Sequence, residues 1–181
     1  MKRILLFHVL AFVLVCGTGR AQTKAVKRTT DVLCLVPSGV GLVKAICDHD
    51  RKGMWQLGLS TATTLAVNYG LEAIVRKDRP DGDGHHAFPS THTAVVWDGA
   101  TYLMRRHGWK WGVPAYAVAT YVAWGRVYTK RHDAWDVLAG AAIGAGAALI
   151  YTRRSDRGTE IALSPATWGR ESCGLACRIT F

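Results

Sequence analysis

Residues 125–136, GRVYTKRHDAWD, place three basic side chains, one histidine and two aspartates within twelve positions. The residues that follow, 137–151 (VLAGAAIGAGAALIY), carry no charge, so a polar segment leads directly into an apolar run of helical length. His132 and Asp136 are four residues apart and would share one helix face, with Cβ atoms about 5–6 Å apart. One interpretation is an ordinary helix start, with an aspartate near the positive end of the helix dipole. The other is a reactive imidazole oriented by a carboxylate, with arginines nearby that bind an anion.

The first 21 residues are typical of a secretory signal peptide. A basic start, MKR, precedes an apolar run of twelve residues (4–15), which is too short for a comfortable membrane span. Small residues, Gly19 and Ala21, occupy both key positions before a cleavage site. We therefore expect cleavage after Ala21 and export to the periplasm or cell envelope. A lipoprotein signal ending at Cys16 is less favoured, because the bulky Val15 precedes that cysteine.

The chain is basic, with a formal net charge of +10 that falls to +7 once residues 1–21 and their three cationic side chains are removed. In an exported protein, this charge favours anionic lipid headgroups or phosphorylated small molecules over nucleic acid. We therefore predict a phosphorylated lipid or small-molecule substrate, contact with a membrane surface, and no nucleic-acid partner. The sequence leaves the oligomeric state open.

Four cysteines remain after the expected cleavage: Cys34, Cys47, Cys173 and Cys177. An even number in an exported protein is typical of disulfide bonds, and four cysteines allow three pairings. Cys34 and Cys47 cannot pair across one straight helix, because thirteen residues would separate them by about 20 Å. Pro37 and Gly39 could break that helix, so the pairing stays open.

The apolar residues come in blocks of helical length, separated by glycine, proline and clusters of charge. We predict helices over the ranges 31–48 (with a possible break at Pro37), 54–76, 90–106, 112–128 and 133–152. The sequence therefore predicts an all-α bundle of five to six helices within residues 22–152. A short C-terminal tail, residues 153–181, is expected to be irregular or β-like.

Two of these helices, over 55–75 and 133–151, approach the length of a membrane span. They contain four charged or amide side chains, Asn68, Glu72, Asp133 and Asp136, and the mean hydropathy is barely positive at +0.07. These features favour a soluble or membrane-attached bundle over a fully polytopic protein. Five tryptophans fit either an aromatic belt at a membrane interface or buried packing: Trp97, Trp109, Trp111, Trp124 and Trp135.

Three polar clusters stand at predicted helix ends: RKDRP (76–80), FPSTHT (88–93) and the stretch 125–136. Helix starts carry unpaired backbone N–H groups, and we expect Ser90 to cap a helix with free amides at Thr91 and His92. Each cluster alone is more often an ordinary helix end than an anion site. Their combination is more specific than any one of them.

This combination resembles the tripartite signature of the type 2 phosphatidic acid phosphatase (PAP2) superfamily, which also includes class A acid phosphatases and vanadium haloperoxidases. The third motif of that family is Ser-Arg, five residues, His, three residues, Asp. Arg126, His132 and Asp136 have this spacing. The second motif is Pro-Ser-Gly-His and the first ends in Arg-Pro. The matching residues are Pro89, Ser90 and His92 for the second motif and Arg79 and Pro80 for the first.

The resemblance implies a phosphatase that hydrolyses phosphate monoesters or diphosphates of a lipid through a phosphohistidine, with no metal or other cofactor. His132 would attack phosphorus while Asp136 orients it, and His92 would protonate the leaving alkoxide. The phosphoryl oxygens would be held by two guanidinium groups and the start of a helix: Arg79, Arg126, Ser90 and Thr91. Phosphoryl transfer depends mainly on positioning and charge compensation, which two arginines can supply.

Three positions depart from the family pattern: Glu72 replaces a lysine, Thr91 a glycine and Gly125 a serine. A carboxylate at position 72 would repel a phosphate if it pointed inward, and Lys77 or Arg76 is a candidate for the missing charge. These departures motivate one alternative, a catalytically weak or non-catalytic protein of the same fold that binds anions or lipid phosphates. Vanadate-dependent halide oxidation, with His132 as the vanadium ligand, is a less favoured alternative.

Residues 81–86, DGDGHH, resemble a metal-binding loop because they contain two aspartates and two histidines. Their spacing matches neither a usual zinc ligand pair nor a full calcium loop. We therefore interpret the segment as a flexible loop over the site and predict no bound metal.

Overall fold

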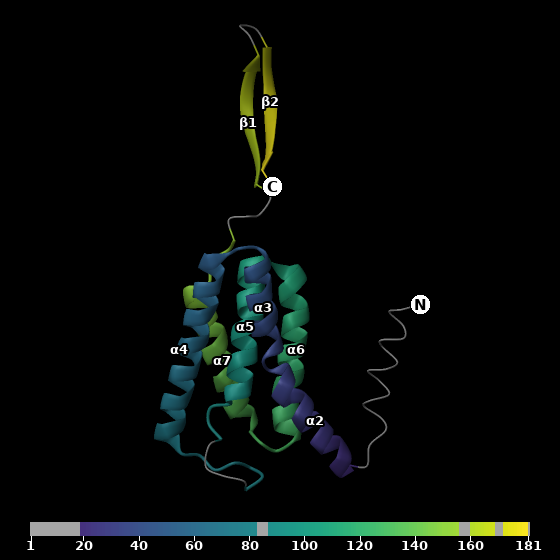
Figure 1. Cartoon of the computed structure of the whole chain (residues 1–181), viewed down its shortest axis with the longest axis vertical. Helices are drawn as coiled ribbons and strands as arrows, with labels where there is room; N and C mark the ends of the chain where they lie inside the picture. Colours follow the sequence, from purple (N-terminus) through teal and green to yellow (C-terminus); the bar gives the residue numbers. More distant parts are fainter. Residues whose placement is uncertain (1–18, 83–86, 156–159, 169–171, 181) are drawn as a thin grey trace, which may run out of the picture.

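The computed structural model describes residues 19–82, 87–155, 160–168 and 172–180, and within them six α-helices precede a β-hairpin (Figure 1). The helices are α2 (Gly19–Leu33), α3 (Val36–Cys47), α4 (Arg51–Val75), α5 (Thr91–His107), α6 (Trp109–Tyr128) and α7 (Ala134–Tyr151). Strands β1 (Glu160–Trp168) and β2 (Ser172–Thr180) pair antiparallel, with Glu160 opposite Thr180. The predicted all-α bundle with a β-like tail is confirmed.

The N-terminal half of the chain differs in detail from the sequence prediction. The predicted break near Pro37 is present, because α2 ends at Leu33 and α3 begins at Val36 with a proline in its first turn. Helix α2 extends back to Gly19 and was largely unpredicted. The proposed cleavage site after Ala21 therefore lies in the first turn of α2, while residues 1–18 lie outside the described part of the chain. Cys34 and Cys47 are both free thiols.

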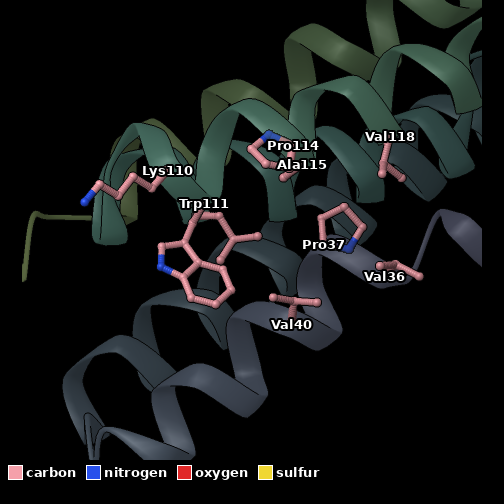
Figure 2. Close-up of a pocket in the computed structure, with 9 residues that line it drawn as sticks. Val36, Pro37, Val40, Lys110, Trp111, Pro114, Ala115 and Val118 are labelled. Carbon is pink, nitrogen blue, oxygen red and sulfur yellow. The ribbon is translucent and has the colours of Figure 1, made fainter. Parts of the chain in front are cut away.

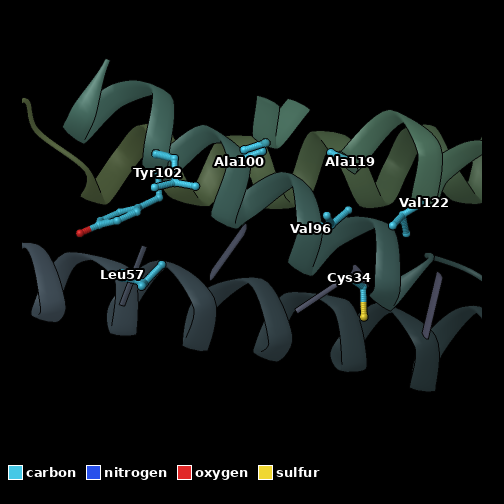
Figure 3. Packing of buried hydrophobic residues seen from close by; sticks show 9 residues of the cluster. Cys34, Leu57, Val96, Ala100, Tyr102, Ala119 and Val122 are labelled. Atoms are coloured by element: carbon cyan, nitrogen blue, oxygen red, sulfur yellow. The ribbon is translucent and has the colours of Figure 1, made fainter. Parts of the chain in front are cut away.

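Helix α5 lies at the centre of the bundle, with α3, α4, α6 and α7 packed around it (Figure 1). A cluster of buried side chains on α4, α5, α6 and the α2–α3 turn forms the core (Figure 3). Its members are Cys34, Leu57, Val96, Ala100, Tyr102, Leu103, Ala115, Ala119 and Val122. The α4–α5 and α6–α7 connections both lie at the lower end of the bundle in Figure 1, so the three polar clusters come together there.

Two glycines allow α7 to approach α5 at backbone distance. A Cβ atom at Gly144 would lie 2.0 Å from the carbonyl oxygen of Ala94, and one at Gly140 would lie 2.5 Å from that of Ser90. Both distances are too short for any side chain, so glycine is required for this contact. The close approach sets the first turn of α7 beside the first turn of α5.

The opposite end of the bundle is held by a buried ion pair. Arg106, at the end of α5, is 5 % exposed and donates to both carboxylate oxygens of Asp50, at 2.7 and 2.8 Å. It also donates to the side-chain oxygen of Gln56 and to the carbonyl oxygen of Arg153. A buried guanidinium with this many acceptors ties α4, α5 and the end of α7 together.

The outer surface of the bundle is rich in large apolar side chains. Within the described residues these exposed side chains lie on α2, α3, α4, α6 and α7 and in the turn before α3, and none lies on the central α5. Two segments, Gln22–Cys47 and Ala134–Tyr151, are long and apolar enough to cross a membrane. Of the five tryptophans considered above, Trp97 packs against Tyr116 at a ring distance of 5.3 Å, whereas the other four are exposed. A surface of this kind is typical of helices that contact lipid.

The contact between α7 and α5 leads to a first prediction. Gly144→Ala places a methyl group against the Ala94 carbonyl and should destabilise the fold by about 1–3 kcal/mol or more. The melting temperature in detergent should fall by at least about 2 °C. Gly146→Ala is the matched control, because a Cβ there has no neighbour within 4 Å. Equal melting temperatures for the two variants would contradict the close packing.

Candidate active site

A cavity of about 230 Å³ lies at the end of the bundle where α4 and α6 end and α5 and α7 begin. Its lining residues are Tyr69, Glu72, Arg79, Thr91, His92, Arg126, Arg131 and His132. Five of the predicted site residues are therefore brought together: Arg79, Thr91, His92, Arg126 and His132. Each of the three sequence clusters contributes to this one cavity, although they are separated along the chain.

The His132 ring is buried and held in one orientation by a backbone carbonyl. Its Nδ1 lies 2.7 Å from the carbonyl oxygen of Ala87. A carbonyl oxygen can only accept, so Nδ1 carries the proton and the lone pair remains on Nε2. Burial lowers the pKa of His132 below its usual range, although the hydrogen bond to Ala87 opposes this; Arg126 lowers it further. The imidazole is therefore neutral at neutral pH, which is the form that can act as a nucleophile.

Asp136 contributes to the site differently from the sequence prediction. Its Oδ2 lies 4.0 Å from His132 Nδ1, which is longer than a hydrogen bond. The carboxylate is fully buried, and it accepts instead from the backbone N–H of Asp133 at 2.9 Å and from Lys77 Nζ at 2.7 Å. Asp133 accepts in return from the backbone N–H of Asp136, which completes a capping box at the start of α7. Asp136 thus fixes the turn that carries His132, and the Ala87 carbonyl fixes the ring.

Lys77 does not line the cavity, so the structure does not place it among the phosphate ligands as the sequence prediction did. Its ammonium donates to both Asp133 and Asp136. Burial lowers the pKa of Lys77, but these two hydrogen bonds outweigh it and raise the pKa above its usual range. The hydrogen bond from Lys77 likewise holds the pKa of Asp133 below its usual range. Lys77 fastens the α4–α5 connection to the start of α7.

The two predicted residues at the start of α5 have different surroundings. Ser90 occupies the N-cap position, but its side chain makes no capping hydrogen bond, and the residue is fully buried and does not line the cavity. Its backbone N–H donates to the carbonyl oxygen of Asp136 at 3.0 Å, which joins α5 to α7. Thr91 lines the cavity, and its hydroxyl accepts from Asn68 Nδ2 at 2.7 Å. Asn68 therefore holds the threonine side chain that replaces the family glycine, a contact that no sequence motif indicated.

Charges of both signs surround the cavity. Three arginines line it, Arg79, Arg126 and Arg131, and so does Glu72. Glu72, at the position where the family pattern has a lysine, thus lies at the cavity together with three guanidinium groups of opposite charge. Sequence analysis did not select Arg131; its position next to His132 in a basic run was the available signal. The site is cationic on balance and suits a small anion such as a phosphoryl group.

Arg126 also has a partner from outside the predicted motifs. Its side chain is 2 % exposed, and its Nη2 donates to Oδ1 of Asp31 on α2. The same carboxylate oxygen lies 3.4 Å from Nε2 of His92. One carboxylate thus contacts two groups that line the cavity.

Two further features of the chain were candidates for a site, an apolar cavity and the sequence DGDGHH. An apolar cavity of about 540 Å³ between α3 and α6 is lined by side chains such as Val40, Trp111 and Val118 and by none of the predicted residues (Figure 2). Within the described residues no group of three His, Cys, Asp or Glu side chains is placed to hold a metal ion. Most of the candidate metal loop, residues 83–86, lies outside the described part of the chain.

Comparison with known proteins agrees with this geometry. The family model of the PAP2 superfamily matches residues 53–159, which include every motif residue named above. The chain belongs to the PAP2 superfamily. The prediction of a phosphatase of this type is thereby confirmed at the level of family and enzyme class.

Among curated relatives of this PAP2 protein, the lipid A 4'-phosphatase of Helicobacter pylori is 30% identical over 135 residues, which cover 68% of each chain. The lipid A 1-phosphatase of Porphyromonas gingivalis is 39% identical over 81 residues, which are 43% of this chain and 18% of that protein. Among solved structures, LpxE of Aquifex aeolicus superposes with a TM-score of 0.59 at 18% identity, over 80% of this chain and 93% of the other. That likeness supports the fold.

The different surroundings of Arg79, which lines the cavity, and Lys77, which contacts Asp136, lead to a second prediction. Arg79→Gln removes a guanidinium from the cavity and should weaken inhibition by inorganic phosphate or vanadate by about 10- to 100-fold. Lys77→Gln should change that inhibition by less than about 3-fold, because Lys77 contacts carboxylates instead of the cavity. It should instead lower the melting temperature. If Lys77→Gln weakened phosphate inhibition as much as Arg79→Gln, the assignment of Lys77 to the α7 start would be wrong.

A third prediction concerns pH. Since the pKa of His132 is lowered, the acid limb of kcat/KM should lie below pH 6.5, the ordinary value for histidine, with activity lost as the ring protonates. Asp136 raises the pKa of His132, so Asp136→Asn should move this limb to still lower pH while it reduces kcat. A pH–rate profile of both proteins tests this, and movement of the limb to higher pH in the variant would contradict it.

Proposed function

We propose that this chain is a membrane-attached phosphatase that removes a phosphate group from lipid A or a similar phosphorylated glycolipid through a phosphohistidine on His132. The observation that carries this proposal is the His132 ring. The Nδ1 of this ring donates a hydrogen bond to the Ala87 carbonyl oxygen. His132 also lines the cavity, together with three arginines. An oriented neutral imidazole in a cationic cavity is suited to attack phosphorus.

The reaction would proceed in two displacements. Arg79, Arg126 and the first amide of α5 hold the phosphoryl oxygens while Nε2 of His132 attacks phosphorus, and the bond from phosphorus to the lipid oxygen breaks. His92 gives a proton to that leaving oxygen. A water molecule then attacks the phosphohistidine, His92 accepts a proton from it, and inorganic phosphate leaves with His132 restored. The arginines supply the charge compensation in both steps.

The outer surface supports action at a membrane. Helix α6 exposes Trp109 and Trp111 near one end and Trp124 and Tyr128 near the other. From Trp109 to Tyr128 the helix rises about 28 Å, close to the roughly 30 Å thickness of the hydrocarbon core of a bilayer. The cavity opens at the end that carries Trp124, Tyr128 and the exposed Trp135. A lipid headgroup in the interfacial layer would therefore be at the level of the site.

Two further parts of the proposal rest on the sequence and on the relatives. Export to the periplasm or cell envelope, after cleavage of residues 1–21, agrees with the signal-like N-terminus. Residues 22–152 would then form the phosphatase domain, with residues 153–181 as an appended tail. The lipid A class is proposed because two curated relatives carry that substrate in their names, although for different phosphates. The position of the phosphate on the lipid is left to experiment.

The alternative, a weakly catalytic or non-catalytic protein that binds lipid phosphates, is favoured by one observation. Glu72 lines the cavity where the family has a lysine. A carboxylate there opposes an incoming phosphate, so it would reduce affinity for the dianion.

The test is a substrate panel with the purified full chain in detergent. We expect phosphate release from lipid A in preference to phosphatidate, a polyprenyl diphosphate and p-nitrophenyl phosphate. His132→Ala should lower the rate at least about 1,000-fold, as expected for loss of a nucleophile. Phosphate binding without turnover, with equal background rates for wild type and His132→Ala, would favour the binding protein instead. Preference for phosphatidate or the diphosphate would agree with a phosphatase but would contradict lipid A as its substrate class.

A further inference from the structure

We propose that Asp31 on α2 is a positioning residue of the phosphatase site, which orients Arg126 and His92 together, and that Gly125 is required to bring it there. This inference rests on the proposed phosphatase function. It concerns a residue outside the region matched by the family model, since that region begins at residue 53. None of the three family motifs contains or predicts it.

The contacts of Asp31 join two groups with separate roles. Its Oδ1 accepts from Nη2 of Arg126, a phosphate ligand in the proposed reaction, and lies 3.4 Å from Nε2 of His92, the proposed acid. Asp31 itself does not line the cavity, whereas both of its partners do. The carboxylate therefore holds both groups from outside the space that the phosphoryl group would enter.

Arg126 needs such a partner. Its side chain is 2 % exposed, and its Nε has no hydrogen-bond partner within the described residues. A buried guanidinium with few acceptors is costly, and a carboxylate both offsets its charge and fixes the plane of its fork. With Nη2 fixed by Asp31, the orientation of the remaining N–H donors is fixed as well.

His92 needs a negative charge to remain an effective acid. The charged groups that act on it from neighbouring segments are the anionic Asp31 and the cationic Arg126, Arg131 and protonated His132. Glu72 lines the same cavity. Burial above all, and then Arg126 and the other cations, lower the pKa of His92 to about 4. The Asp31 carboxylate beside Nε2 opposes this and stabilises the imidazolium that must protonate the leaving oxygen.

The absence of a side chain at Gly125 allows α2 to pack closely against α6. A Cβ atom at position 125 would lie 2.5 Å from Cγ2 of Thr30 and 3.2 Å from Cγ1 of Val26, both on the face of α2 packed against α6. Thr30 is fully buried and directly precedes Asp31. The serine that the family has at this position would push α2 away from α6 and withdraw the carboxylate. The departure at Gly125 and the contact made by Asp31 are thus parts of one arrangement.

The first experiment compares Asp31→Asn and Asp31→Glu on two substrates with different leaving groups. p-Nitrophenyl phosphate has a good leaving group that needs little protonation, whereas the alkoxide of a lipid phosphate needs an acid. We expect Asp31→Asn to lower kcat/KM by at least about 10-fold for the lipid and by about 3-fold for p-nitrophenyl phosphate, with the larger loss in kcat. Asp31→Glu should restore part of the lipid activity, because it keeps the charge.

The second experiment moves α2 without changing Asp31. Gly125→Ala should reproduce the leaving-group dependence of Asp31→Asn, and it should add little when combined with Asp31→Asn. Thr30→Ser removes the clashing Cγ2 and should restore activity to Gly125→Ala. Gly58→Ala is the control, because a Cβ there has no neighbour within 4 Å, and it should leave both rates unchanged. Melting temperatures show that each variant is folded.

The outcomes separate this inference from the function on which it rests. Equal losses on both substrates, or no loss in Asp31→Asn while His132→Ala is inactive, would overturn the positioning role and leave the phosphatase intact. Higher activity in Asp31→Asn would also overturn it, because Asp31 would then compete with the substrate phosphate for Arg126. An inactive wild type would overturn the phosphatase function itself.

Discussion

The approach of α7 to the start of α5 at backbone distance is the constraint on which the site depends. Gly140 allows this approach, and the backbone N–H of Ser90 then donates to the carbonyl oxygen of Asp136 at 3.0 Å. The segment with the proposed acid His92 and the segment with the proposed nucleophile His132 are thereby joined through main-chain atoms. Side chains can change rotamer, but two helix starts that share a backbone hydrogen bond cannot separate without local unfolding. The reacting groups are positioned by the fold itself.

Two buried charges near this contact are paired with opposite charges. The fully buried Asp136 is neutralised by Lys77, and the nearly buried Arg126 is neutralised by Asp31. Burial of an unpaired charge costs several kcal/mol, so these two pairs allow ionised groups next to a largely apolar bundle. The His132 ring is held by the Ala87 carbonyl, and burial keeps the ring uncharged because it lowers the pKa of His132. The site therefore combines fixed cations, which suit a phosphoryl group, with the neutral imidazole proposed as the nucleophile.

Much of the fold could be predicted because the apolar blocks are bounded by strong helix-ending signals, such as the Pro37 turn and the polar loop at 77–89. Helix α2 was largely missed because its residues are mainly polar and basic, with no apolar run to mark it. The motif spacing predicted which residues meet at the cavity, since helix ends that share one end of a bundle lie close together. The motif spacing could not predict the partner of Lys77. Lys77 and Arg79 are only two residues apart, and the conformation of the loop decides which of the two side chains reaches the cavity and which contacts the carboxylates. The role of the Ala87 carbonyl could not be predicted, because every residue type has a backbone carbonyl. The role of Asp31 could not be predicted, because Asp31 is 95 residues from Arg126 in the sequence.

In the proposed mechanism, His132 attacks phosphorus through Nε2 while its Nδ1 donates a hydrogen bond to the Ala87 carbonyl. The most direct measurement is a rapid quench at alkaline pH during turnover, followed by mass spectrometry of the peptide that contains His132 and by ³¹P NMR to identify the phosphorylated nitrogen. The account predicts a phosphoryl group on Nε2 of His132 that disappears as substrate is consumed. A phosphoryl group on Nδ1 or on His92, or turnover with no phosphorylated histidine at all, would contradict it.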